Sequence, residues 1–242
     1  MAIPYGRGLR QGERCAELAR TAYKRDSFTL TKLILCEGPT DEAFIRALAR
    51  HRGHHECCVR HVAEGNADEA GGRDRIFDFL IGIPIWPGFG DITDILIVVD
   101  SDDDPAASFA NVQAHIGRAL LTVPGQYPVP QTMSLKELGS PSVTVLLIPW
   151  EDVVGNLEAL IYPAAREGAG ANAACVDAFA ACAGVDNWTK DTSKTEMKLR
   201  SLLALNEDNP FIGLGRVWSE QLIPISHPTF QQVGDAIDLF LT

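Results

Sequence analysis

Short apolar runs alternate with amphipathic stretches along the first two thirds of the chain. The apolar runs predict strands at 30–36, 56–63, 94–100 and 142–148. The stretches that follow them carry helical periodicity and predict helices at 39–52, 67–82, 105–121 and 156–163. Apolar strands that alternate with helices are typical of right-handed crossovers and of a parallel sheet covered on both faces. The pattern therefore predicts an α/β fold with a mostly parallel sheet and helices on both faces.

The pattern changes near residue 168, beyond which helical periodicity recurs without strands. It predicts helices at 171–183, 194–206, 210–220 and 229–241. At the other end, the first residues show the charge spacing of an exposed helix or arm and carry no apolar signal core. The expected organisation is an N-terminal arm or helix at 1–28, a core at 29–165 and a helical C-terminal extension at 166–242 packed on that core.

Carboxylates stand where two of the apolar runs end. Glu37 follows the first run, and Asp100 closes the third, with Asp102 two residues later. The carboxyl ends of parallel strands share one edge of a sheet, and ligands of open parallel sheets bind there. We therefore expect Glu37, Asp100 and Asp102 to lie close together. Because Asp100 and Asp102 are two residues apart, they would face the same way in an extended segment.

Asp41 is expected to join this group from the first turn of the following helix. Gly38 and Pro39 suit the cap and the first position of a helix, which would turn Asp41 back toward Glu37. Clustered carboxylates repel one another, and a shared divalent cation is the usual way to stabilise them. Their hard oxygens suit Mg²⁺ or Mn²⁺, so the sequence predicts a site for one or two such ions.

Each of these residues also has a purely structural explanation. Asp41 is favoured in a first helical turn by the helix dipole alone. Asp104 stands directly before Pro105 and suits a helix N-cap. Residues 100–103 also fit a solvated acidic turn. Taken together, the two strand-end patterns favour the metal site over these separate explanations.

The segments EGPTD at 37–41 and DSD at 100–102 resemble the two motifs of the TOPRIM domain, the metal-binding catalytic module of topoisomerases, bacterial primases and OLD-family nucleases. The resemblance extends over about 30–165. It implies that the four carboxylates named above bind metal. It also implies that all of them except Asp41 take part in catalysis, with Glu37 as a ligand or as a general base.

Within that superfamily the chain is most similar to the OLD-like nucleases, because of NLEALI at 156–161. Such proteins carry a further acidic metal ligand at the start of a helix after the fourth strand. The resemblance places this ligand at Glu158. The alternative is that Glu158 only stabilises the first turn of a helix that Asn156 caps.

The same family uses a downstream lysine to offset charge on the phosphate, and the resemblance assigns this role to Lys194 or Lys198. Lys190 precedes them at the same spacing of four, so the three could share one helix face. Ser193 and Glu196 fit a capping box, which would place Lys194 in the first turn. A solvated basic face is the alternative interpretation, and the residues do not decide between Lys194 and Lys198.

Composition narrows the function classes. The formal net charge is −11, which argues against a protein that coats nucleic acid through its own field. No run approaches the roughly 20 apolar residues of a membrane span, so no membrane partner is expected. The six cysteines lack CxxC pairing and suit reduced thiols in the cytoplasm. The His and Cys residues within 51–61 match no standard zinc finger, and Cys57 and Cys58 would point to opposite faces of a strand.

The resemblance implies metal-dependent phosphodiester hydrolysis of DNA or RNA. No Walker A segment occurs in the sequence, so an ATPase like the one fused to TOPRIM in full-length OLD proteins would be a separate partner. Two alternatives stay open. One is a non-catalytic binding or regulatory module that keeps the fold. The other is a hydrolase of a small phosphorylated molecule, which suits the acidic balance.

Overall fold

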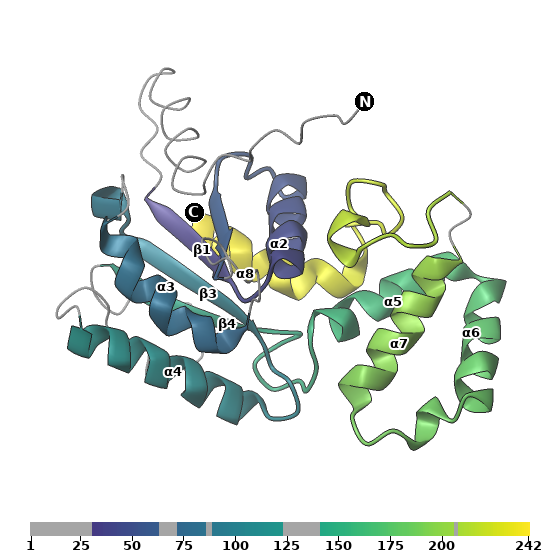
Figure 1. Cartoon of the computed structure of the whole chain (residues 1–242). Coiled ribbons are helices and arrows are strands. Elements are labelled where there is room, and N and C mark those ends of the chain that lie inside the picture. Colours follow the sequence, from purple (N-terminus) through teal and green to yellow (C-terminus); the bar gives the residue numbers. More distant parts are fainter. Residues whose placement is uncertain (1–30, 63–71, 86–88, 123–140, 206–207) are drawn as a thin grey trace, which may run out of the picture.

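The computed structural model describes residues 31–62, 72–85, 89–122, 141–205 and 208–242. The predicted arm at 1–28 and the beginning of the predicted helix at 67–82 lie outside these ranges. Within the described ranges the chain forms one parallel sheet and a set of helices (Figure 1). None of the described helices is long and apolar enough to cross a membrane.

A four-stranded sheet forms the centre of the fold. Its strands are β1 (Lys32–Cys36), β2 (Cys58–His61), β3 (Asp94–Asp100) and β4 (Ser142–Ile148). All neighbouring strands run parallel, in the order β2-β1-β3-β4. The predicted α/β fold with a parallel sheet is therefore confirmed.

Helices cover both faces of the sheet, which explains why its strands are apolar throughout. Side chains alternate between the faces, so that Ile34 of β1 packs in one buried cluster and Leu33 in the other. The first cluster includes side chains of α2 (Pro39–His51), α5 (Leu157–Ala169), α6 (Ala171–Cys182), α7 (Asp191–Ala204) and α8 (Gln231–Leu241). The second includes side chains of α3 (Ile76–Gly82) and α4 (Pro105–Thr122).

The C-terminal helices share the core of the sheet. In Figure 1, α5, α6 and α7 project beyond the sheet, but Val176 of α6 and Leu199 of α7 belong to the same buried cluster as Ile34. The last helix, α8, returns to the sheet, where Lys32 Nζ donates to the carbonyl oxygen of Phe240 at 2.7 Å. The extension therefore packs continuously with the core, and the border expected at residue 165 lies inside α5.

The strand order creates a topological switch point between β1 and β3. From β1 the chain passes through α2 on one face to β2, and from β3 it passes through α4 on the opposite face to β4. In open α/β sheets, ligands bind beside such a point, at the carboxyl ends of the strands. Glu37 directly follows β1 and Asp100 ends β3, so both carboxylates lie at this point.

Two predicted helices differ from the structure in the C-terminal region. The span 210–220 contains a short 3₁₀ turn at Leu214–Arg216 instead of an α-helix, since glycines at 213 and 215 disfavour helix formation. Helix α7 begins at Asp191, with Lys190 as its N-cap. Ser193 therefore lies inside the first turn, and the predicted capping box was wrong.

Two further boundaries were also misplaced. Helix α5 continues past Pro163 to Ala169, because its buried stripe extends through Ala164 and Ala165. Strand β2 is shorter than predicted and begins after Cys57. Cys57 nevertheless packs against the first buried cluster while Cys58 lies in the second, so the two cysteines do point to opposite faces.

Candidate metal centre

The turn between β1 and α2 positions the first two carboxylates. Gly38 is the N-cap of α2 and Pro39 its first residue, as predicted. The backbone N–H of Gly38 donates to Asp41 Oδ2 at 2.8 Å, so the start of the helix folds Asp41 back onto the end of the strand. Glu37 stays at the strand end, where the backbone N–H of Arg73 donates to its Oε1 at 3.1 Å.

The start of α5 positions the next two carboxylates, those of Asp100 and Glu158. The backbone N–H of Leu157 donates to Asp100 Oδ1 at 3.0 Å, which joins the end of β3 to the first turn of α5. Asn156 caps this helix by accepting a hydrogen bond from the backbone N–H of Ala159 at 3.0 Å, as predicted. Glu158 lies in the same first turn. The helix N-terminus favours both acidic side chains, because its backbone N–H groups carry partial positive charge.

Asp102 reaches the site through a turn. Its φ of 53° is left-handed, a conformation that Asp tolerates better than most residues. The backbone N–H of Gly155 donates to the carbonyl oxygen of Asp102 at 2.8 Å and fixes this turn. The expectation that Asp100 and Asp102 share one direction in an extended segment was therefore wrong. The side chain of Asp102 is 58% exposed.

One arginine lies among these carboxylates. Arg73 opens a 3₁₀ turn, and its side chain is only 14% exposed. Its Nη2 donates to the carbonyl oxygen of Asp100 at 2.6 Å and to Asp102 Oδ2 at 2.9 Å. The same nitrogen lies 3.6 Å from Glu37 Oε2, while Nη1 donates to Ser108 Oγ at 2.9 Å. The guanidinium therefore bridges the ends of β1 and β3.

The carboxyl groups are short of positive charge. Burial, followed by repulsion from Asp41 and Glu37, raises the pKa of Asp100 well above its ordinary value. Burial and the charge of Glu37 raise the pKa of Asp41 to about 7. Burial also raises the pKa of Glu37, although the Arg73 guanidinium opposes this shift, and it raises the pKa of Glu158. A further cation would favour the ionised form of all four groups.

The cluster offers suitable ligands but is not arranged as a closed metal site. Across the described ranges, no three His, Cys, Asp or Glu side chains are placed to hold one ion together. Arg73 explains this arrangement, because it lies between Glu37 and Asp102. Glu37 Oε2 is buried and accepts no well-formed hydrogen bond from the described part of the chain. The donor set therefore fits a hard divalent cation in its chemistry, and one buried oxygen is available as a ligand.

The lysines expected to face the phosphate lie in ion pairs on α7. Lys194 Nζ is 2.9 Å from Asp191 Oδ1, one turn earlier. Lys198 Nζ is 3.6 Å from Asp177 Oδ1 and 3.7 Å from Asp186 Oδ1. Lys198 thus faces α6 and the turn after it.

Comparison with known proteins identifies the family of the chain. A family model described as "Protein of unknown function (DUF3226)" matches residues 31–235. The chain belongs to the DUF3226 family. No curated protein and no solved structure matches it. The family model begins just before β1 and ends inside α8, so it covers the sheet, the carboxylates and the C-terminal helices as one unit.

Two basic residues near the site of this DUF3226 protein were not predicted. Arg73 falls within the predicted helix at 67–82, where a charged residue attracts no notice, and the signal available was Gly72, whose φ of 129° marks a break. On α7, Arg200 lowers the pKa of Glu158 while Glu196 raises it. These two residues are four apart, as the lysines are, so periodicity alone does not tell which face of α7 meets the site.

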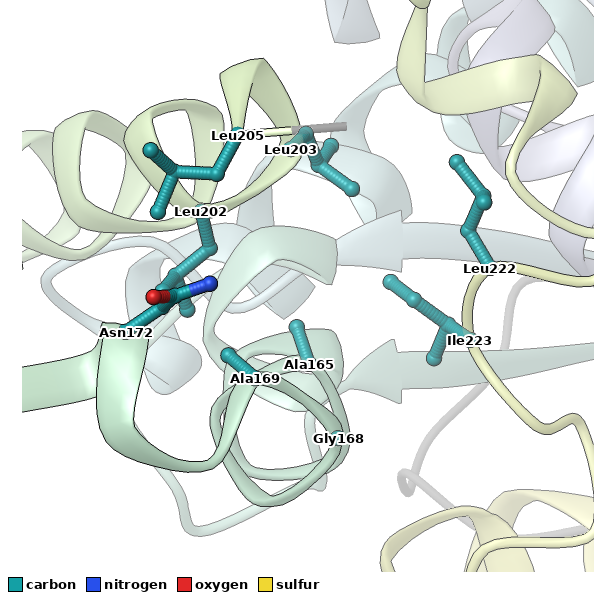
Figure 2. Close-up of a pocket in the computed structure, with 9 residues that line it drawn as sticks. All are labelled: Ala165, Gly168, Ala169, Asn172, Leu202, Leu203, Leu205, Leu222 and Ile223. Carbon is teal, nitrogen blue, oxygen red and sulfur yellow. The ribbon is translucent and has the colours of Figure 1, made fainter. Parts of the chain in front are cut away.

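A pocket of about 180 Å³, lined mostly by apolar side chains, lies elsewhere in this DUF3226 protein, among the C-terminal helices. Figure 2 shows its walls, formed by the end of α5, the end of α7 and the segment with Leu222 and Ile223, with Asn172 as the polar side chain. Ala165, at its edge, lies seven residues beyond Glu158 on α5, which is roughly 10 Å along the helix. The described lining carries no charged group, so the pocket is distinct from the carboxylate cluster.

Proposed function

We propose that this protein hydrolyses phosphodiester bonds in DNA or RNA with the help of Mg²⁺ or Mn²⁺ held by the carboxylate cluster. One observation carries the proposal: Glu37 and Asp100 meet at the switch point of the sheet in a cluster with more negative than positive charge. Perturbed carboxylates at the carboxyl edge of a parallel sheet mark functional sites more often than structural ones. The resemblance of the two strand-end motifs to the TOPRIM domain supports the same proposal.

The ligands of this proposal are Glu37, Asp41, Asp100, Asp102 and Glu158. A divalent ion bound there would polarise the phosphate and lower the pKa of a nearby water. Glu37 is the residue best placed to act as general base or as ligand, because its Oε2 is buried and makes no well-formed hydrogen bond to the described residues. Asp41 and Asp100 are held by backbone N–H groups, which suits residues that must keep a fixed position.

A lysine of α7 completes the proposed site. Either Lys194 or Lys198 would offset negative charge on the phosphate. Each would have to exchange an exposed carboxylate partner for a phosphate oxygen, and such exposed pairs are weak enough for this exchange.

The proposal is tested with the purified full chain. With Mn²⁺ or Mg²⁺ it should nick supercoiled plasmid or degrade single-stranded DNA or RNA, and EDTA should stop the reaction. Glu37→Gln and Asp102→Asn should each abolish cleavage while the protein stays folded, whereas the matched surface variant Asp177→Asn should retain it. Cleavage that survives Glu37→Gln, or a chain that neither binds metal nor cleaves any substrate, would contradict the proposal.

Two other functions each rest on one observation. A non-catalytic binding or regulatory module is favoured by the position of Arg73 among the carboxylates. A hydrolase of a small phosphorylated molecule is favoured by the net charge of −11, because an acidic protein repels a long polyanion. Metal binding without turnover of any phosphate ester would identify the first. Release of phosphate from small esters, with polymers left intact, would identify the second.

Partners and location follow from the same proposal. Since the chain is acidic, we include a separate ATPase partner that would bring nucleic acid to the site. The cytoplasm suits such a protein, because its cysteines show the spacing of reduced thiols and nucleic acid is present there.

A further inference from the structure

We propose that Arg73 is a built-in counter-cation that competes with the divalent ion for the carboxylate cluster, and so sets the metal affinity of the site. This inference rests on the proposed metal site and concerns its regulation. The Arg73 guanidinium contacts both strand ends that carry the motif carboxylates. No sequence motif assigns it a role.

The position of the guanidinium carries the argument. Its Nη2 lies 2.9 Å from Asp102 Oδ2 and 3.6 Å from Glu37 Oε2. An ion bound to both oxygens would lie about 2.0–2.2 Å from each of them. The guanidinium and the ion would share the same two oxygens, and because both are cationic they repel each other at this range. Each therefore weakens the binding of the other.

The hydrogen bonds of Arg73 show that the fold holds its side chain in this position. Nη1 donates to Ser108 Oγ at 2.9 Å, and that hydroxyl in turn donates to the carbonyl oxygen of Ser101 at 2.8 Å. The backbone N–H of Arg73 donates to Glu37 Oε1. Both serines are buried. The guanidinium is therefore held from α4 through Ser108 and from the end of β3 through the carbonyl oxygen of Asp100, and it is not a surface side chain that happens to rest on the site.

The release of Arg73 also follows from its surroundings. Its Nε is buried and makes no well-formed hydrogen bond to the described residues, so its present contacts do not satisfy every donor. Asp102, its carboxylate partner, is more than half exposed, which leaves the guanidinium an open direction toward solvent or toward a phosphate. A divalent ion brings twice the charge of the guanidinium to the same oxygens. We therefore expect metal to displace Arg73, at a cost that weakens the measured affinity.

The test measures Mn²⁺ affinity by calorimetry or electron paramagnetic resonance at fixed pH and ionic strength. Arg73→Gln should bind Mn²⁺ about tenfold more tightly than the unmodified chain, a typical size for coupling between two ligands of one site. The matched control is Arg75→Gln, which removes the same charge two residues further along the chain. The Arg75 side chain is paired with Asp78. It should stay within about twofold.

A second variant protects the test against misfolding. Ser108→Ala removes the anchor of Nη1 while leaving all charges in place, and it should tighten Mn²⁺ binding by a smaller factor. If Arg73→Gln does not fold, Ser108→Ala alone decides: tighter binding supports the proposal and unchanged binding overturns it.

The outcomes separate the two proposals. Equal or weaker Mn²⁺ binding by folded Arg73→Gln, with good binding by the unmodified chain, overturns the counter-cation and leaves the metal site standing. Mn²⁺ binding by neither protein overturns both. Binding that appears only in Arg73→Gln supports the counter-cation most strongly, because the site would then be blocked by Arg73 itself.

Discussion

Two aspartates of this molecule experience opposite electrostatic surroundings. Asp177 on α6 lies at the surface, where Arg166 Nη1 is 2.6 Å away and Lys198 Nζ 3.6 Å away. The hydrogen bond from Arg166 is the main cause that lowers the pKa of Asp177. Asp100 lies at the carboxyl edge of the sheet among other carboxylates, and burial raises its pKa well above the ordinary value.

The difference shows where the chain balances its charges and where it does not. On α6 and α7 each carboxylate of the network has a basic partner in contact with solvent, as expected for a surface held by weak ion pairs. At the sheet edge two carboxylates, those of Glu37 and Asp102, share Arg73. Burying like charges costs free energy, which is why we propose a role other than stability for this edge.

The largest expected effect comes from replacing Asp100 with asparagine, and the same replacement at Asp177 is the control. Asp100→Asn should lower metal-dependent cleavage by at least about 100-fold and abolish stabilisation by Mn²⁺, since loss of a ligand costs at least as much as loss of its supporting contacts. Without metal the variant should be as stable as the unmodified chain or more so, because repulsion is relieved. Asp177→Asn should change neither the cleavage rate nor the stabilisation by Mn²⁺.

Thermal melts with EDTA and with Mn²⁺, together with cleavage rates, measure these effects. A large loss of stability in metal-free Asp100→Asn would show that Asp100 is structural. It would also remove the contrast with Asp177.

The second effect is a pH dependence of metal-free stability that Asp41 introduces. Its pKa in the folded protein is raised to about 7, so the unfolded chain loses this proton first as pH rises above about 4. Stability should therefore fall as pH rises through about 4–7 and then level off. Because His61 and His115 have lowered pKa values and contribute the opposite slope, the comparison must be made against Asp41→Asn.

Melting temperatures of both proteins in EDTA, from pH 4 to pH 8, test this slope. Asp41→Asn and the unmodified chain should melt together near pH 4, and the variant should melt several degrees higher at pH 8. Parallel curves over the whole range would mean that Asp41 is not held in a carboxylate-rich setting.

The third effect concerns the turn that presents Asp102. Gly155 has a φ of +146°, and a Cβ there would lie 2.9 Å from the Cβ of Ala159. Gly155→Ala should cost about 1–3 kcal/mol of unfolding free energy and weaken Mn²⁺ binding, because its N–H holds Asp102. The control Gly168→Ala, inside α5 with open space around it, should gain about 0.5–1 kcal/mol. Denaturant titration of both variants measures the difference, and equal effects would contradict the strained turn.

The smallest effects on stability are expected on α7. Lys194→Ala and Lys198→Ala each remove exposed ion pairs and should cost less than about 1 kcal/mol. Their cleavage rates should differ, with a loss of about 100-fold in one variant, because removing one donor that stabilises charge in the transition state has this order of effect. Full activity in both would remove the lysines from the proposed site and leave the basic residues Arg73 and Arg200 as candidates.

Features of this fold that depend only on neighbouring residues were predicted correctly from the sequence. The strand at 142–148, the Gly38 and Asn156 caps and the Asp104 cap, which accepts from the backbone N–H of Ala107 at 3.0 Å, all agree with the structure. Each depends on residues within one turn or one strand. The pairing of strand ends followed from parallel topology, so the neighbourhood of Glu37 and Asp100 was also predictable.

Contacts that depend on tertiary packing were not predictable. Arg73 reaches Asp102 across 29 positions, and nothing in its local sequence indicates that contact. The left-handed turn at Asp102 depends on a hydrogen bond from Gly155, which belongs to the segment after β4. The ion pairs of Lys198 with α6 likewise depend on how two helices pack. These contacts decide the geometry of the candidate site.

Mn²⁺ soaked into crystals of the full chain, with its anomalous scattering recorded, tests the metal site most directly. We expect an anomalous peak at the carboxyl edge of the sheet, within ligand distance of Glu37, Asp100 and Asp102, and the Arg73 guanidinium moved away from it. At saturating Mn²⁺, an edge without any peak and with Arg73 still on Asp102 would contradict the metal site.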